Sequence, residues 1–264
     1  MTDTDNLSAL WPLMDRLADA AASETLKHFR GGALQTTSKT EDFDPVTVAD
    51  RAAEAAIRAI LEKERPDDGI LGEEFGPKPS ESGLTWVLDP IDGTRGYISG
   101  TPTWGTLIAL SDEGGPLLGV VDQPYIGERF RGGAGTANMD GPLGRRPLAT
   151  STVTSLSEAT LFTTFPEVGT PKDRAAFERV AEHVQLVRYG CDCYAYALLA
   201  AGQIELVIEA GLNPYDIQGP IAVVQAAGGI VTDWEGRPAH NGGHAIAAAN
   251  ADIHAAALEY LARS

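Results

Sequence analysis

The segment Asp89-Pro90-Ile91-Asp92-Gly93-Thr94 holds the residues best suited to chemistry in this chain of 264 residues. The apolar run Trp86-Val87-Leu88 precedes it and predicts a buried strand that ends at the first carboxylate. Two carboxylates three residues apart on a loop can converge on one point, and hard cations such as Mg²⁺ bind such oxygens together with phosphate oxygens. Gly93 permits a close backbone approach and Thr94 supplies a hydroxyl. The alternative is a surface turn rich in Asp, Pro and Gly.

Three other acidic positions accompany this segment. Gly72-Glu73-Glu74 follows the short apolar pair Ile70-Leu71, and adjacent glutamates at a strand end are ordinarily solvated charges. Beside a second acidic loop, however, they become candidate metal ligands. Asp50 stands near the start of a helical pattern, and Asp216 ends the sequence Asn213-Pro214-Tyr215-Asp216. Each of these two aspartates could simply cap or support a helix start.

These blocks and the later Ala227-Gly228-Gly229, in this order, resemble the inositol monophosphatase family of metal-dependent phosphatases. The resemblance runs from about Lys39 to the C-terminus. It implies a mixed α+β and α/β fold, the layered α/β/α/β/α sandwich of inositol monophosphatases and fructose-1,6-bisphosphatases. One departure is that Gln225 and Ala226 stand where relatives often carry an acid.

The resemblance also implies an activity and a set of roles. The chain is expected to be a Mg²⁺-dependent phosphomonoesterase with two or three Mg²⁺ per site, Mn²⁺ being a possible substitute, in which a metal-activated water attacks phosphorus in line. The implied metal ligands are Glu73, Asp89, the Ile91 carbonyl, Asp92 and Asp216. The implied catalytic residues, which help to orient or deprotonate the water, are Asp50, Glu73 and Thr94. The amides of Gly93 and Thr94 would bind phosphate, with Lys39 and Glu74 supporting the site.

Substrate choice is expected to depend on Gly190-Cys191-Asp192-Cys193-Tyr194 and on Glu209. A carboxylate and an aromatic ring suit a cationic, planar or amine-bearing substrate. This pattern resembles the histidinol-phosphate phosphatase branch of the family, as do Arg95-Gly96-Tyr97 and Trp104-Gly105-Thr106. The expected reaction converts L-histidinol phosphate to L-histidinol and phosphate in histidine biosynthesis. The predicted substrate contacts are Asp192, Glu209, Tyr194 and Arg188, although Asp192 could equally cap the following helix.

Composition restricts the partners. With 37 acidic and 20 basic residues the net charge is −17, which argues against a nucleic acid or an anionic membrane. The same charge would repel a phosphate ester, so the site needs cations. Cys191 and Cys193 are too close in sequence for a disulfide framework. The chain has no long apolar stretch and an acidic start, so we expect a soluble cytoplasmic protein with a small-molecule substrate.

The spacing of apolar residues predicts the elements that position these groups. Helices are expected over residues 7–29 and 48–61, followed by a strand meander from 103 to 131 and a Gly-rich loop or edge hairpin over 132–146. Strands and helices then alternate, with a helix predicted over 220–227. We expect an N-terminal α+β half, residues 1–148, with most metal ligands. A C-terminal α/β half, residues 149–264, would carry the last metal ligand and the specificity residues, and the halves would form one compact unit.

Two rival functions remain open at this stage. The enzyme could prefer inositol 1-phosphate or act broadly on small phosphate esters, or the chain could be a catalytically silent binding or regulatory subunit. The intact acidic blocks argue against silence. Because members of the resembled family are commonly dimers, a homodimer is expected.

Overall fold

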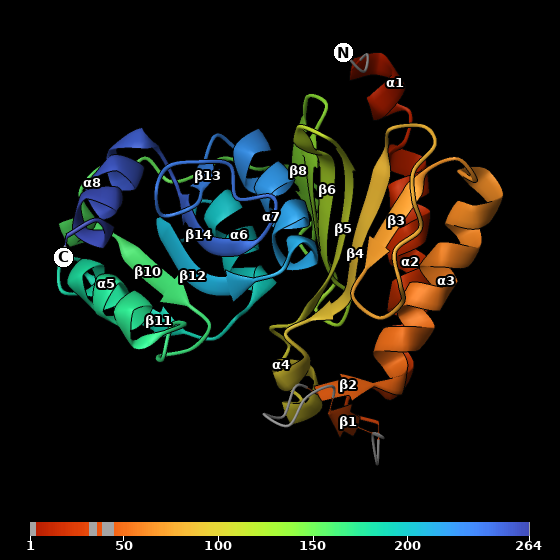
Figure 1. Ribbon diagram of the computed structural model, residues 1–264, viewed down its shortest axis with the longest axis horizontal. Coiled ribbons are helices and arrows are strands. Elements are labelled where there is room, and N and C mark those ends of the chain that lie inside the picture. Colours follow the sequence, from red (N-terminus) through yellow and green to blue (C-terminus); the bar gives the residue numbers. More distant parts are fainter. Residues whose placement is uncertain (1–3, 32–35, 39–44, 264) are drawn as a thin grey trace.

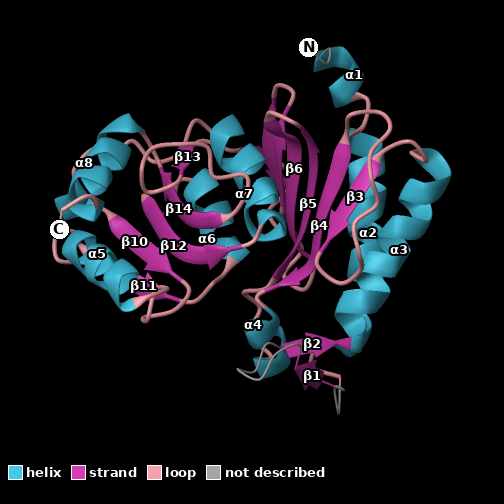
Figure 2. Ribbon diagram, viewed as in Figure 1, coloured by secondary structure: helices cyan, strands magenta, loops and turns pink. Residues whose placement is uncertain are grey.

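The computed structural model describes residues 4–31, 36–38 and 45–263. The described helices and sheets alternate in five layers, running from α2 and α3 at one side of the molecule to α5 and α8 at the other (Figures 1 and 2). The predicted α/β/α/β/α sandwich is therefore confirmed. Within the described residues, no helix combines the length and the apolar character needed to cross a membrane. The predicted support residue Lys39 lies outside the described residues.

The second layer is a sheet that has seven strands in the described part of the chain, and we call it the large sheet. Its strands are β3 (Gly69–Gly72), β4 (Thr85–Asp92), β5 (Gly105–Asp112), β6 (Gly115–Gln123), β7 (Glu128–Gly133), β8 (Thr136–Asp140) and β9 (Arg146–Pro147). They lie side by side in sequence order, with β3 parallel to β4 and the later neighbours antiparallel. The predicted meander is confirmed, and the Gly-rich segment contributes to the end of β7, to β8 and to the edge strand β9.

Helices α2 (Trp11–His28) and α3 (Val48–Glu64) cover the outer face of the large sheet. Their apolar residues recur at helical spacing and pack on the strands, as the contact of Leu17 and Ile57 with the buried Trp86 cluster shows. A short helix, α1 (Thr4–Ser8), precedes α2, and the hairpin β1 (Thr36–Ser38) and β2 (Pro45–Thr47) leads into α3. The sequence predicted both long helices correctly.

The middle layer consists of α6 (Cys193–Ala200) and α7 (Pro214–Ala226), which lie between the two sheets. Helix α7 approaches the large sheet very closely. An added Cβ at Gly119 or Gly132 would come within 2.4 Å of the α7 backbone, so these strand positions need glycine. Because α7 is fixed in this way, residues in its first turn have a defined position relative to the large sheet.

The fourth layer is a sheet that has five strands among the described residues, and we call it the small sheet. Its order is β11 (Leu186–Tyr189), β10 (Thr160–Thr163), β12 (Leu206–Leu212), β14 (Gly243–Ala248) and β13 (Ile230–Thr232). The first three are parallel, and β14 is antiparallel to both of its neighbours. Helices α5 (Pro171–Ala181) and α8 (Ala251–Leu261) cover its outer face, where Phe177 and Ile253 are fully or almost fully buried.

The prediction for α7 was wrong at its start. An Ala/Val-rich helix was expected to begin at Pro220, but the helix begins at Pro214 and Pro220 lies inside it. An interior proline removes one helical hydrogen bond, and the burial of α7 between two sheets offsets that loss. Consequently Asp216 belongs to the first turn of a rigid helix rather than to a loop.

The strands divide near residue 148. The described strands up to β9 belong to the large sheet or the β1–β2 hairpin, and the later ones, after a short 3₁₀ turn at Leu156–Glu158, belong to the small sheet. The division into halves 1–148 and 149–264 that form one compact unit stays a prediction.

Candidate active site

An irregularity in β4 brings two predicted ligands together. Asp89 pairs with Leu107 of β5 and Asp92 pairs with Gly105, so three steps along β4 oppose two steps along β5. In a regular strand, side chains three positions apart point to opposite faces, and a bulge of one residue corrects this alternation. Within the bulge, Asp89 Oδ1 accepts a hydrogen bond from the Ile91 amide at 3.0 Å. The bulge lets both aspartates face one point.

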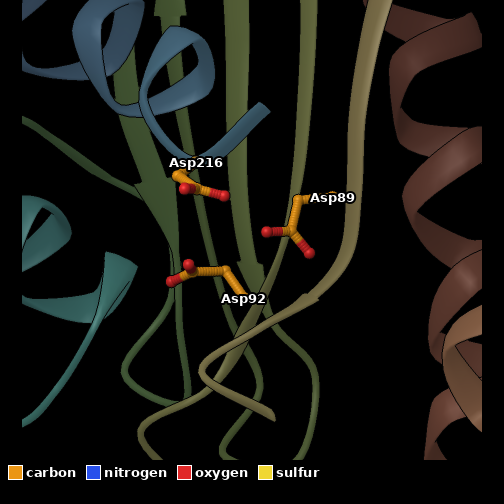
Figure 3. A group of neighbouring side chains, drawn as sticks. All are labelled: Asp89, Asp92 and Asp216. Carbon is orange, nitrogen blue, oxygen red and sulfur yellow. The ribbon is translucent and has the colours of Figure 1, made fainter. Parts of the chain in front are cut away.

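Asp216 completes a cluster with these two residues. One carboxylate oxygen from each of Asp89, Asp92 and Asp216 lies within 4.8 Å of the others. Figure 3 shows Asp216 extending from the start of α7 toward the two residues of β4. Its Oδ2 also accepts a hydrogen bond from the Asn213 amide at 2.7 Å, which caps the helix. The two roles considered from the sequence, a helix cap and a member of the acidic cluster, are thus combined in one side chain.

The small-sheet half also fixes Asp92. The Cys193 amide, in the first turn of α6, donates a hydrogen bond to Asp92 Oδ2 at 2.5 Å. Amides in the first turn of a helix have no acceptor within the helix and carry partial positive charge, so they favour a carboxylate. Asp92 is therefore oriented by an element that lies about a hundred residues further along the chain.

The cluster is electrostatically suited to a cation. Burial raises the pKa of Asp89 well above its usual range, and the nearby charges of Glu73 and then Asp92 raise it further. Burial likewise raises the pKa of Asp92, followed by the charge of Asp192. A divalent cation would offset this repulsion, and an all-oxygen donor set is what Mg²⁺ prefers. The residues present therefore fit a Mg²⁺ site.

A pocket of about 360 Å³ surrounds the cluster, within the size range of small-molecule sites. The described residues that line it include these six acids: Glu73, Asp89, Asp92, Asp192, Glu209 and Asp216. Ile91, Gly93 and Thr94 also line it, and the last two begin α4 (Thr94–Ser99) with amides in its first turn. Thr94 Oγ1 donates a hydrogen bond to the Ile91 carbonyl at 3.0 Å. The structure thus gathers the predicted metal and phosphate ligands in one pocket.

Asp192 reaches the same pocket from a strained loop. Gly190, Cys191 and Asp192 have successive φ angles of 90°, 82° and 45°, a conformation that is costly for the last two residues and is found mainly at functional sites. The carboxylate lies against Gly93, where an added Cβ would come within 3.0 Å of it. Although Asp192 occupies the N-cap position of α6, its side chain makes no capping hydrogen bond there with the described helix, so the capping interpretation was wrong.

Glu209, in the middle of β12 where the pairing with β14 becomes irregular, supplies a second carboxylate. Its Oε1 accepts hydrogen bonds from the Thr164 amide at 2.7 Å and the Thr164 hydroxyl at 2.8 Å. Burial nevertheless raises the pKa of Glu209 to about 7, since it outweighs these hydrogen bonds. Burial also raises the pKa of Asp192 to about 6, while the charge of Arg95 acts in the opposite direction. The two predicted substrate acids therefore line the pocket and titrate close to neutral pH.

Two other predicted substrate contacts lie elsewhere. The hydroxyl of Tyr194 donates a hydrogen bond to Glu128 Oε2 at 2.6 Å, and its ring packs edge-on against Phe130 at 6.2 Å between centroids. Arg188 is exposed on β11. Neither belongs to the described lining of the pocket. The structure therefore gives neither residue a place in the pocket lining, and their role as substrate contacts stays a prediction.

Asp50 and Glu74 lie beside the site rather than in the described pocket lining. Asp50 Oδ2 accepts a hydrogen bond from the Thr47 amide at 2.9 Å in a capping box at the start of α3. Burial raises its pKa to about 6, and the charges of Glu74 and Glu73 contribute. Glu74 is paired with Arg51 at 3.6 Å. The capping role of Asp50 is observed, and its catalytic role stays a prediction.

Sequence reasoning missed Glu54, a fully buried acid on α3. Its Oε2 accepts a hydrogen bond from the Glu74 amide at 2.8 Å, and its Oε1 accepts one from the Phe75 amide at 3.3 Å and pairs with Arg58 at 2.8 Å. Glu54 thereby holds the loop that carries Glu73. The only signal in the sequence was an acid on the apolar side of a helix, at a position that helical spacing places near Ala53 and Ile57.

Comparisons with known proteins agree with this geometry. The family model described as the inositol monophosphatase family matches residues 12–264. The Bifunctional phosphatase IMPL2, chloroplastic, of Arabidopsis thaliana is 40% identical, over 98% of this chain and 76% of its own length. A histidinol-phosphatase of Chlorobaculum parvum is 38% identical over 89% of both chains. The structure of an inositol monophosphatase from Zymomonas mobilis superposes with a TM-score of 0.82 at 38% identity, covering 94% of this chain and 95% of that one.

Proposed function

The chain belongs to the inositol monophosphatase family and is a phosphatase, and from this premise we propose that it hydrolyses L-histidinol phosphate to L-histidinol and phosphate with the help of Mg²⁺. The observation that carries the substrate is the presence of Asp192 and Glu209 in the pocket that also holds the Asp89 cluster. Anionic groups for the cations and anionic groups for a substrate amine are thus available within one pocket.

We infer that Mg²⁺ is held by the oxygens of Glu73, Asp89, Ile91, Asp92 and Asp216. When bound, the cations would activate the attacking water, neutralise the phosphate ester and stabilise the leaving oxygen. Two or three ions per site, with Mn²⁺ as a substitute, stay a prediction. The support for this set is that all five residues line the pocket and that their donors are oxygens throughout.

The chain's own residues would bind phosphate and control the proton of the attacking water. Gly93 and Thr94 present first-turn amides to the phosphate, as helix starts commonly do for anions. The Thr94 hydroxyl, fixed by its hydrogen bond to Ile91, would orient the water, and Glu73 would accept its proton. Asp50 would act behind them, since its charge interacts with that of Glu73.

The substrate's cationic end would bind Asp192 and Glu209. Above a pH of about 7 both carboxyls are ionised, and charge-assisted hydrogen bonds from an amine or imidazolium are roughly twice as strong as neutral ones. A polyol such as inositol carries no cationic group that could bind these carboxylates. The two carboxylates would therefore favour histidinol phosphate over inositol phosphate.

The test is a phosphate-release panel with Mg²⁺ that compares L-histidinol phosphate, myo-inositol 1-phosphate, fructose 1,6-bisphosphate and adenosine 3′,5′-bisphosphate by kcat/KM. We expect a preference for histidinol phosphate of about a hundredfold, or about 2.7 kcal/mol of transition-state discrimination. Asp192→Asn should reduce this preference, whereas Asp67→Asn, at an exposed position far along the chain, should not. A flat profile would refute the substrate and leave the phosphatase chemistry intact.

The second candidate substrate is inositol 1-phosphate, and the 38% identity to the Zymomonas mobilis inositol monophosphatase favours it. The same panel decides between them. A silent regulatory role would be supported only if the chain released no phosphate from any of these esters, with Mg²⁺ or with a chelator. The homodimeric state and the cytoplasmic location stay predictions, which light scattering and cell fractionation would test.

A further inference from the structure

The turn that leads into α6 presents two groups to the candidate active site. The carboxylate of Asp192 lies against Gly93, and the amide of Cys193 donates a hydrogen bond to Asp92 Oδ2 at 2.5 Å. Asp192 belongs to the proposed substrate contacts, and Asp92 belongs to the proposed metal ligands. The position of this turn relative to the metal loop therefore affects both.

The backbone of this turn needs support from its surroundings. Cys191 and Asp192 both have positive φ angles, a costly conformation that persists only where neighbouring contacts hold it. The amide of Tyr194 donates a hydrogen bond to the Cys191 carbonyl at 2.8 Å and closes the turn. This bond joins two residues of the turn itself, so it does not fix the turn relative to the large sheet.

The side chain of Tyr194 connects the turn to the large sheet. Its hydroxyl donates a hydrogen bond to Oε2 of Glu128, the first residue of β7, at 2.6 Å. A carboxylate acceptor makes such a hydrogen bond short and strong. The tyrosine side chain is rigid, with two rotatable torsions, and its ring packs against Phe130. The bond to Glu128 therefore holds the backbone of Tyr194 at a defined place above the sheet.

Two neighbouring residues thus anchor the start of α6 on two separate strands. The amide of Cys193 binds Asp92 of β4, and the hydroxyl of Tyr194 binds Glu128 of β7. Strands β5 and β6 lie between β4 and β7 in the large sheet. A single anchor would leave the start of α6 free to tilt, whereas two anchors on different strands fix its orientation.

We propose that Tyr194 is a positioning residue, whose hydroxyl bond to Glu128 sets both the affinity for Mg²⁺ and the choice of substrate. Without this bond the strained turn relaxes, which shifts Asp192 from Gly93 and weakens the bond between the Cys193 amide and Asp92. The effect on substrate choice rests on the proposed function, because it requires a substrate with a cation. The effect on Mg²⁺ requires only that Asp92 is a metal ligand.

The experiment compares Tyr194→Phe with Tyr260→Phe in the full-length protein. The first variant removes one hydroxyl and keeps the ring, and the second removes a hydroxyl from α8, on the outer face of the small sheet. Titration calorimetry measures the Kd of Mg²⁺, and phosphate release gives the kcat/KM ratio of L-histidinol phosphate to myo-inositol 1-phosphate. In Tyr194→Phe we expect the Kd to rise and the ratio to fall, each about three- to tenfold. Tyr260→Phe should change neither.

Substitutions of Glu128 separate positioning from direct contact with the substrate. Glu128→Gln keeps an oxygen that can accept the Tyr194 hydroxyl and should stay close to the wild type, whereas Glu128→Leu should reproduce Tyr194→Phe. The double variant of Tyr194→Phe and Glu128→Leu should be no worse than either single variant, because both remove the same bond. If the Tyr194 hydroxyl bound the substrate itself, Tyr194→Phe would alter only the ratio and Glu128→Leu would alter nothing. That result would overturn the inference.

The Mg²⁺ measurement keeps this inference distinct from the proposed function. An unchanged Kd of Mg²⁺ in Tyr194→Phe would overturn the inference whatever the ratio does, and a lowered unfolding temperature in chelator would then assign the bond to stability alone. If the wild-type enzyme shows no preference among the esters, the proposed substrate is wrong, while a raised Kd in Tyr194→Phe and Glu128→Leu would still support the positioning role.

Discussion

Asp89 lies at the centre of the acidic cluster, where its buried carboxylate meets the charges of Glu73, Asp92 and Asp216. Asp89→Asn keeps the size of the side chain and removes the charge that the cations would share. We expect kcat/KM to fall by about a hundred- to a thousandfold, the range found when one preorganised electrostatic group is removed from a site. The control is Asp67→Asn, which alters an exposed acid. Phosphate release with saturating Mg²⁺ measures the effect, and most activity surviving would contradict the ligand assignment.

Glu209 links the proposed substrate preference to pH. Burial raises its pKa to about 7, so the group is neutral below that pH and negative above it, and only the negative form attracts a cation. An imidazolium loses its proton near pH 6.5, whereas aliphatic amines stay protonated below about pH 8, so the prediction takes the substrate amine as the partner of Glu209. The kcat/KM ratio of histidinol phosphate to inositol 1-phosphate should therefore rise as the pH increases from about 5.5 to 7.5, in step with the ionisation of a carboxyl of raised pKa.

Glu209→Gln cannot ionise and provides the control for this rise, since its ratio should vary less with pH. Both substrates share the ionisation of the phosphate and of the metal ligands, so those effects cancel in the ratio. A ratio that falls or stays constant with pH in the wild-type enzyme would remove Glu209 from the proposed substrate contacts.

The arrangement of the site explains which of its residues could be predicted from the sequence. Asp89, Asp92 and Thr94 are contiguous, and their types alone indicate oxygen ligands for a cation and a phosphate. Tyr194 was misplaced because a helix turns by about 100° per residue, so that Cys193 and Tyr196 line the pocket while Tyr194 points to Glu128. The segment Cys193–Ala200 is apolar on all sides of the helix, so its sequence does not show which side faces the pocket.

At the level of elements, the position of Glu73 depends on α3. Glu54 on this helix accepts the amides of Glu74 and Phe75, and an added Cβ at Gly72 would come within 2.0 Å of its carboxylate. In Glu54→Gln one of the two amides faces an NH₂ group, and Arg58 loses its charged partner. We expect the Mg²⁺ concentration for half-maximal activity to rise about tenfold or more, the usual cost of altering a group that holds a metal ligand.

The control for this prediction is Glu62→Gln on the exposed side of the same helix. Mg²⁺ titration of phosphate release is measured together with thermal unfolding in the presence of a chelator. A lower unfolding temperature with an unchanged Mg²⁺ requirement would mean that Glu54 serves stability alone and does not position the loop.

Elements were easier to predict than their irregularities. Apolar spacing was sufficient for α2 and α3, because each buries one face against the large sheet, and for the meander, because its strands are short apolar runs between turns. Pro90 marks an irregularity in β4, because proline inside a sheet is confined to edges and bulges. That the bulge turns Asp89 and Asp92 to the same side, however, depends on the pairing with β5. The early start of α7 was missed for a related reason, since contacts with two sheets hold an interior Pro220 that local propensity disfavours.

At the level of the whole molecule, the candidate metal centre lies between the large sheet and helix α7 of the middle layer. Asp89 and Asp92 come from the large sheet, and Asp216 comes from α7, which packs between the sheets. Element order and the family resemblance predicted the five layers, whereas residue patterns alone could not place α7 against Gly119 and Gly132. A cation bound by ligands from β4 and α7 should therefore stabilise the packing of α7 on the large sheet as well as support catalysis.

Mg²⁺ should consequently raise the unfolding temperature of the whole chain. A ligand at about a hundred times its Kd stabilises the folded state by about 2.7 kcal/mol. For a chain of this size each kcal/mol shifts Tm by about 2–4 °C. Together these values give an expected rise in Tm of about 5–10 °C.

Asp216→Asn should reduce this rise, because Asn can still cap α7 but brings no charge to the cluster. Asp252→Asn alters an exposed acid in the first turn of α8 and controls for helix-end effects. Calorimetry with Mg²⁺ and with chelator measures both shifts. An equal rise in wild type and Asp216→Asn would show that the cation binds without α7, and would confine the metal site to the N-terminal half.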